Sequence, residues 1–229
     1  MDFGENPLSD TSGKKYNIMQ QFYKDKDLDT AVLEIKNPDN NLPPGLKLRK
    51  EDSAQLDLRY VSLIGFGHPQ GRTNTKTFEH CCRIVNPSSA EMRSALAWLS
   101  SVAQVFRNDL IVQGKDPMEV DRGYKNYDAD FKILFHCFME HGSSGGPIIR
   151  VCHGSQDDAK SVEVIGIVTH AMPELFFQLT PNLKRYFPEN RRFEAGTKTS
   201  HIFEKMKRDN CDVAEFADHL FNVEPMDES

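Results

Sequence analysis

Three things that the chain lacks narrow its function. It has no apolar stretch close to the roughly 18 residues that a membrane-spanning helix needs. It has no long run of basic residues, and its 34 Asp and Glu outnumber its 28 Lys and Arg, for a net charge of −6. Residues 1–6 lack the basic and apolar regions of a secretory signal. We therefore expect neither a membrane nor a nucleic acid as a partner.

The cysteines form no obvious disulfide framework. There are five, an odd number with one adjacent pair, and none has the Cys-x-x-Cys spacing of a zinc site. They are Cys81, Cys82, Cys137, Cys152 and Cys211. We expect reduced thiols in an intracellular compartment, the cytoplasm or nucleus, and no metal or other cofactor. The 229 residues are enough for one large all-β domain or two small ones.

A Gly- and Ser-rich turn lies at residues 141–147, His-Gly-Ser-Ser-Gly-Gly-Pro, between strand-like segments on both sides. Gly tolerates positive φ and lets another backbone come close. Such a turn can expose the Ser144 hydroxyl as a nucleophile and aim the N–H groups of Gly142 and Ser144 at one developing oxyanion. The alternative is a flexible Gly/Ser loop.

The run Gly-Ser-Ser-Gly-Gly-Pro resembles the nucleophile motif of the trypsin-like serine peptidases, with Ser143 where that motif usually has Asp. The same replacement occurs in intracellular relatives such as the HtrA-type peptidases. The resemblance implies an all-β fold of two barrels and peptide-bond hydrolysis through an acyl-enzyme on Ser144.

Asp29 begins a second segment of resemblance, Asp-Thr-Ala-Val-Leu. In the family, the matching Asp lies behind the catalytic histidine and orients it. Taken alone, an Asp before a strand is commonly a turn residue. Its separation from Ser144 is longer than in a compact relative, which implies an insertion between the two.

The catalytic histidine has no counterpart. The family order of His, Asp and Ser puts it upstream of Asp29, whereas the first histidine of this chain is His68. The chain therefore looks N-terminally incomplete, with a partial first barrel, and we expect little or no activity from it alone. Either the full-length product supplies the base, or this is a shortened, inactive form. The candidate replacement bases are His68, His136, His141 and His170.

The middle of the chain reads as the second barrel. Residues 37–45 have a linker composition, and residues 56–65 alternate like a core strand. The turn that follows contains His68, which we interpret as a turn residue. A capping box at 88–91 and apolar residues at helical spacing predict a helix over 88–108, packed on the barrel. Residues 114–130 are expected to form a loop near the site.

Residues 162–171 give the third resemblance, to the family strand that pairs with the substrate backbone. Thr169, His170 and Ala171 then match the residues beside the specificity pocket, and Phe138 matches the pocket floor. An apolar floor implies a preference for a large apolar or aromatic side chain at the cleaved residue.

The end of the chain is predicted to be helical. Residues 188–200 are polar and basic and are interpreted as a connector, and apolar periodicity predicts helices at 201–207 and 213–221. The expected organisation is a remnant of the first barrel with its linker at 1–45, the second barrel at 46–190 with its helical insertion, and a helical tail at 191–229.

Two functions follow. The first is a serine endopeptidase acting on a protein or peptide substrate. The second is a pseudopeptidase or peptide-binding module that uses the same groove without cleavage. An unrelated β-rich fold with a chance Gly/Ser loop is the third interpretation, and no particular oligomeric state is indicated.

Overall fold

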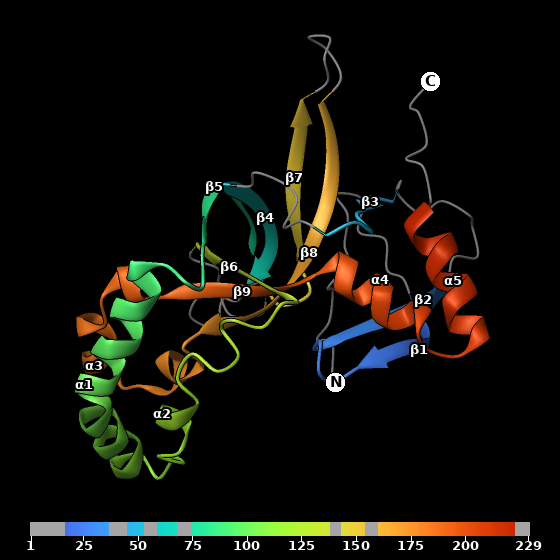
Figure 1. Ribbon diagram of the computed structural model, residues 1–229. Helices are drawn as coiled ribbons and strands as arrows, with labels where there is room; N and C mark the ends of the chain where they lie inside the picture. The colour runs from blue at the N-terminus through green and yellow to red at the C-terminus, as the bar shows by residue number, and fades with distance from the viewer. Residues whose placement is uncertain are drawn as a thin grey trace.

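The computed structural model describes residues 17–36, 45–52, 59–67, 75–137, 143–153 and 160–222. In this part of the chain, six antiparallel strands close into a barrel at the centre of the molecule (Figure 1), in the order β8-β7-β4-β5-β6-β9 with β9 paired back to β8. The strands are β4 (Tyr60–Gly67), β5 (Thr75–Val85), β6 (Lys132–His136), β7 (Pro147–His153), β8 (Lys160–Met172) and β9 (Phe193–Lys198). A short strand, β3 (Lys47–Leu48), joins β8 in parallel.

Apolar residues from β4, β5, β6, β7 and β8 fill the barrel. The buried cluster inside it is made of Val61, Leu63, Cys82, Ile133, Phe135, Cys137, Ile148, Ile165 and Val168. Two glycines, Gly166 on β8 and Gly196 on β9, let the strands lie close to one another and to the Ile148 side chain. A Cβ on Gly196 would lie 2.2 Å from Ile148 Cδ1 and 2.7 Å from the Ile167 carbonyl oxygen, so the close packing requires glycine.

A helical lobe packs on one side of the barrel (Figure 1). It contains α1 (Ala90–Val112), α2 (Glu119–Arg122), η3 (Glu174–Gln178), α3 (Pro181–Tyr186) and η4 (Glu189–Arg191). The helix expected at 88–108 is α1, which begins one residue later than the capping box implied, because Ser89 Oγ accepts the Met92 N–H at 3.1 Å. Glu91 reaches Arg83 instead of closing the box. Trp98, Phe106 and Phe187 form an aromatic centre in this lobe.

A two-stranded hairpin and two C-terminal helices form the other flank (Figure 1). The hairpin pairs β1 (Asn17–Asp25) with β2 (Thr30–Lys36), and the helices are α4 (Thr199–Lys207) and α5 (Cys211–Asn222). Their shared buried cluster is Tyr23, Leu28, Ile202, Met206, Val213, Ala217 and Phe221. The hairpin stands where the first barrel was expected, as a separate two-stranded sheet.

The coarse prediction, a mostly β chain with a helical insertion and C-terminal helices, is confirmed. The connector predicted at 188–200 is wrong, because residues 193–198 form β9, which closes the barrel by pairing with both β6 and β8. The barrel therefore continues to Lys198 and does not stop at the predicted boundary of 190. The prediction failed because this strand has polar residues in the interior of the protein, where Glu194 and Thr197 are both buried.

Candidate active site

The turn before β7 is held in place by the barrel. Gly145 takes a φ of +92°, a conformation that favours glycine, and its N–H donates to the Val168 carbonyl at 2.8 Å. The Gly146 N–H donates to the Ser143 carbonyl at 3.0 Å. Ser143 is buried, whereas Ser144 is exposed. The turn thus presents one of its two hydroxyls, that of Ser144, at the surface.

The Ser144 hydroxyl points to β8. Its Oγ donates a hydrogen bond of 2.7 Å to the Thr169 carbonyl oxygen. A peptide carbonyl accepts a hydrogen bond but does not take up a proton at neutral pH, so this contact positions the hydroxyl without activating it. Cleavage chemistry at Ser144 therefore needs a separate general base.

Asp29 is placed by the turn between β1 and β2. Asp25 Oδ1 accepts the N–H groups of Asp27 and Leu28 at 2.9 Å each, which organises the turn. Leu28 is buried, and its carbonyl accepts a 2.7 Å hydrogen bond from Thr197 Oγ1 on β9. Asp29 follows with a φ of +52°, a left-handed conformation that Asp tolerates better than most residues. The turn is therefore fixed to the barrel beside Asp29.

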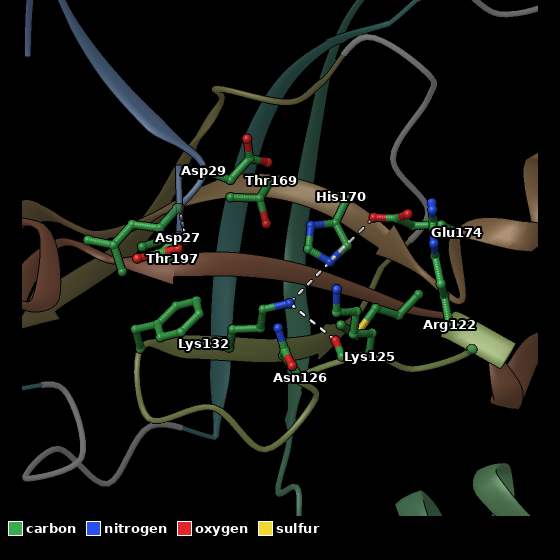
Figure 2. Close-up of a pocket in the computed structure, with 14 residues that line it drawn as sticks. Asp27, Asp29, Arg122, Lys125, Asn126, Lys132, Thr169, His170, Glu174 and Thr197 are labelled. Carbon is green, nitrogen blue, oxygen red and sulfur yellow. Dashed lines mark hydrogen bonds and ion pairs between the residues drawn. The ribbon is translucent and has the colours of Figure 1, made fainter. Parts of the chain in front are cut away.

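One pocket brings Asp29 and Thr169 together (Figure 2). Its cavity volume is about 160 Å³. The walls come from the β1–β2 turn, the end of α2 with the segment after it, the strands β6, β8 and β9, and the start of η3. The lining residues are Asp27, Leu28, Asp29, Arg122, Gly123, Lys125, Asn126, Phe131, Lys132, Thr169, His170, Met172, Glu174 and Thr197.

An irregularity in β8 explains why neighbouring residues share this pocket. In a regular strand, successive side chains point to opposite faces. The β8–β9 register shifts between Val168 and His170, and Thr169 and His170 both line the cavity. Bulges of this kind redirect side chains. The strand thereby presents the Thr169 carbonyl to Ser144 and the His170 ring to the pocket.

The His170 imidazole lies between charged groups (Figure 2). Its Nε2 is 3.2 Å from Lys132 Nζ and 3.9 Å from Glu174 Oε1. Burial lowers the pKa of His170, the Lys132 charge lowers it further, and Glu174 and Asp29 oppose both effects. A lowered pKa favours the neutral ring, whose Nε2 accepts a hydrogen bond from the ammonium.

Lys132 itself is half-buried in the pocket. Burial lowers its pKa, and nearby Lys125 adds to that, against the attraction of Glu174 and Asp29. Besides the His170 contact, its Nζ lies 3.5 Å from the Lys125 carbonyl oxygen. Both of these partners are neutral acceptors.

The structure separates the predicted residues into three groups. Asp29, Thr169 and His170 line the pocket, and Ser144, which does not line it, contacts the Thr169 carbonyl through its hydroxyl. Ala171 lies on β8, paired with Glu194. Phe138, His141, Gly142 and His68 lie outside the described residues.

Of the other candidate bases, His136 is engaged elsewhere. Its Nε2 lies 2.7 Å from Glu91 Oε1, and Glu91 also pairs with Arg83. His170 contacts Lys132. Among the described residues, the hydrogen bond of the Ser144 hydroxyl is to a carbonyl and not to an imidazole.

Sequence reasoning missed the wall opposite His170, which includes Lys132, Asn126 and Thr197. One signal was available. Lys132 is the lone charge in a run of apolar residues, Phe-Lys-Ile-Leu-Phe. A charge that begins a buried strand needs a reason to be there.

No group of three or more His, Cys, Asp or Glu side chains in the described ranges is arranged to hold a metal ion. None of the helices that the structure describes has the length and apolar character to cross a membrane. In comparisons with known proteins, no model of a protein family and no curated sequence matches the chain.

Proposed function

We propose that the chain carries the nucleophile and the orienting acid of a trypsin-like serine endopeptidase, with Ser144 as the nucleophile and Asp29 as the acid that orients the base. The observation that carries this proposal is the convergence at Thr169. Its carbonyl binds the Ser144 hydroxyl, and Thr169 and Asp29 line the same pocket. The six-stranded barrel would then be the second barrel of the two-barrel fold, and the β1–β2 hairpin a part of the first.

The base that the mechanism needs would lie between Asp29 and Ser144, beside Thr169. Its imidazole would donate one N–H to the Asp29 carboxylate. Ser144 Oγ would turn from the Thr169 carbonyl to the second ring nitrogen, which would take its proton. In the family order, that histidine belongs upstream of Asp29.

The chemistry would then follow the two steps of acyl transfer. Ser144 Oγ attacks the peptide carbonyl, the N–H groups of Gly142 and Ser144 bind the oxyanion, and the protonated imidazole gives its proton to the leaving amine. Water, deprotonated by the same base, hydrolyses the acyl-enzyme. Without the base, this chain alone would be almost inactive.

The substrate would bind as an added strand. β8 is paired with β7 only as far as Val168, so that residues 169–172 have no strand on that side among the described residues, while β9 covers the other side. An extended peptide can pair with such an edge next to Ser144. An apolar floor at Phe138 favours a large apolar or aromatic side chain at the cleaved residue. We place the activity inside the cell, because the cysteines lack a disulfide framework.

One observation favours a second candidate, a peptide-binding module without cleavage. The Ser144 hydroxyl bonds a carbonyl, a state that holds it inactive. Such a module would use the same β8 edge and the same pocket.

A fluorophosphonate probe tests the proposal, because it labels activated serines. We expect slow labelling of the chain, and labelling at least about tenfold faster with free imidazole, since a general base contributes roughly 10²–10⁴-fold. Ser144→Ala should abolish the labelling, and Asp29→Asn should weaken the response to imidazole. The matched control is Ser143→Ala, which removes the neighbouring buried hydroxyl and should still be labelled.

Two results would decide against the enzyme. Labelling that does not depend on Ser144, or no labelling with or without imidazole, excludes Ser144 as a nucleophile. If extended peptides still bind the chain in the latter case, the binding module is the correct function.

A further inference from the structure

Lys132 differs from other shielded cations of the barrel. Arg49 is 3.4 Å from Glu163 Oε2, and Lys198 is 3.5 Å from Asp52 Oδ1, so each is paired with a carboxylate. The described ion pairs give Lys132 no such partner, and its neighbours are an imidazole nitrogen and a peptide carbonyl. A charge taken partly out of water without an opposite charge costs free energy.

The pocket offers the Lys132 ammonium no direct ion pair among the described residues. His170 accepts its hydrogen bond as a neutral ring. Three carboxylates also line the pocket, those of Asp27, Asp29 and Glu174, and all three residues are exposed to solvent. Glu174 and Asp29 attract the Lys132 charge, and Arg122 and Lys125 add positive charge to the same space. A carboxylate that enters the cavity would form the direct ion pair that Lys132 lacks there.

The position of the pocket indicates where such an anion would come from. Thr169 and His170 line it, and they belong to the edge of β8 that, among the residues that the structure describes, has no strand partner next to Ser144. A peptide paired along that edge places side chains alternately towards and away from the barrel. We expect a side chain directed towards His170 to enter the cavity, where Lys132 Nζ lies 3.2 Å from His170 Nε2 (Figure 2).

We propose that this pocket recognises an acidic side chain, Asp or Glu, of an extended peptide, and that the Lys132 ammonium binds its carboxylate and determines specificity. The inference rests on the proposed function, because that function places the peptide along β8. The bond would be a charge-assisted hydrogen bond in a partly dry site, which is stronger than a neutral one. A few such polar groups in a cavity are what orient a ligand.

Peptide binding to the Ser144→Ala variant tests the proposal without cleavage. Fluorescent extended peptides are made in pairs that differ only by Glu or Gln at one position, and their affinities are measured by anisotropy. At one position, the Glu peptide should bind about tenfold more tightly, the size of one hydrogen bond to a charged group. Lys132→Met should erase this difference, and Lys132→Arg should keep most of it.

The control is Lys184→Met, which removes an exposed lysine bonded to the Phe177 carbonyl, away from the pocket. It should leave the difference unchanged. If Lys132→Met does not fold, the same pairs are measured on the Ser144→Ala variant at rising salt, where the advantage of Glu must shrink. Equal affinity for Glu and Gln at every position, or a preference that survives Lys132→Met, overturns the proposal.

These outcomes are distinct from those of the fluorophosphonate test. Ser144 labelling with no preference for Glu leaves the peptidase standing and removes the acidic subsite. A Lys132-dependent preference for Glu without any labelling supports the subsite in a module that binds but does not cut.

Discussion

The helical lobe and the β1–β2 hairpin both pack on the barrel and both line the pocket, but they are held in different ways. The lobe buries a large apolar core around α1, with Leu110 fully buried and Phe106 stacked on Phe187 at 5.8 Å. The hairpin keeps apolar side chains such as Met19 exposed, at 59%, and buries Tyr23 and Leu28 in the cluster that it shares with α4 and α5. One wall of the pocket thus rests on the core around α1, whereas the wall that carries Asp29 rests on that second cluster and on the hydrogen bond from Thr197 to the Leu28 carbonyl.

This difference suggests that the lobe mainly stabilises the fold, whereas the hairpin contact mainly positions Asp29. A change in the lobe core should affect the stability of the whole fold, because burial of apolar area is the main stabilising contribution. A change at the hairpin contact should cost less and act mainly on the placement of Asp29. The predictions below test that division.

The largest effect is expected from Phe106→Ala in the lobe. The side chain is 4% exposed and packs against Trp98 and Phe187. Its truncation should lower the free energy of unfolding by about 3–5 kcal/mol, measured by urea denaturation. Val105→Ala, at the neighbouring and 54% exposed position, is the control and should change it by less than about 0.5 kcal/mol. Similar losses for the two variants would contradict a packed lobe.

An intermediate effect is expected from Thr197→Val, which removes the donor to the Leu28 carbonyl. The free energy of unfolding should fall by about 1–3 kcal/mol, and amide hydrogen exchange in β1 and β2 should accelerate. Thr199→Val is the matched control. Thr199 is equally buried, and its Oγ1 donates to the Arg49 carbonyl at 2.7 Å, so it should lose stability without loosening the hairpin. Unchanged exchange in the Thr197 variant would show that the hairpin is held by other contacts.

The smallest effect is expected from Glu91→Gln, at the start of α1. The Arg83 hydrogen bonds, followed by the His136 contact, hold the pKa of Glu91 below its ordinary 4.5 despite partial burial. The ion pair therefore stabilises the fold above that pH, and the stabilisation is lost as the pH falls through the lowered pKa. The variant should be less stable by about 1 kcal/mol at pH 7 and equal to the parent in acid, measured by thermal unfolding across pH. A difference that does not depend on pH would exclude the ion pair as its cause.

The sequence predicted those helices and strands in which the apolar residues recur with the period of the helix or strand. Met92, Leu99 and Phe106 recur at helical spacing, and they are buried on the inner face of α1. The strand β9 was missed because burial on both faces leaves no alternation, and because Thr197 is polar for a reason that lies far away in the sequence, its hydrogen bond to the Leu28 carbonyl.

The candidate site divides in the same way. The exposed position of Ser144 in a tight turn could be predicted from the local motif, because the positive φ at residue 145 favours glycine. Lys132 could not be placed, because its partner His170 is distant in sequence and only the closure of the barrel by β9 brings β6 and β8 together. Local chemistry is readable from local sequence, while a pocket between strands depends on the sheet order.

In the part of the chain that the structure describes, residues 169–172 of β8 have no strand on one side, and this affects the behaviour of the protein at high concentration. Peptide groups along an open strand edge do not discriminate between a ligand and a neighbouring copy of the same molecule. Crowding the chain should therefore favour dimers joined through residues 169–172. Such dimers would cover Ser144, so that a bound peptide and a second copy of the chain would compete for the same edge, and the peptide would keep the protein monomeric.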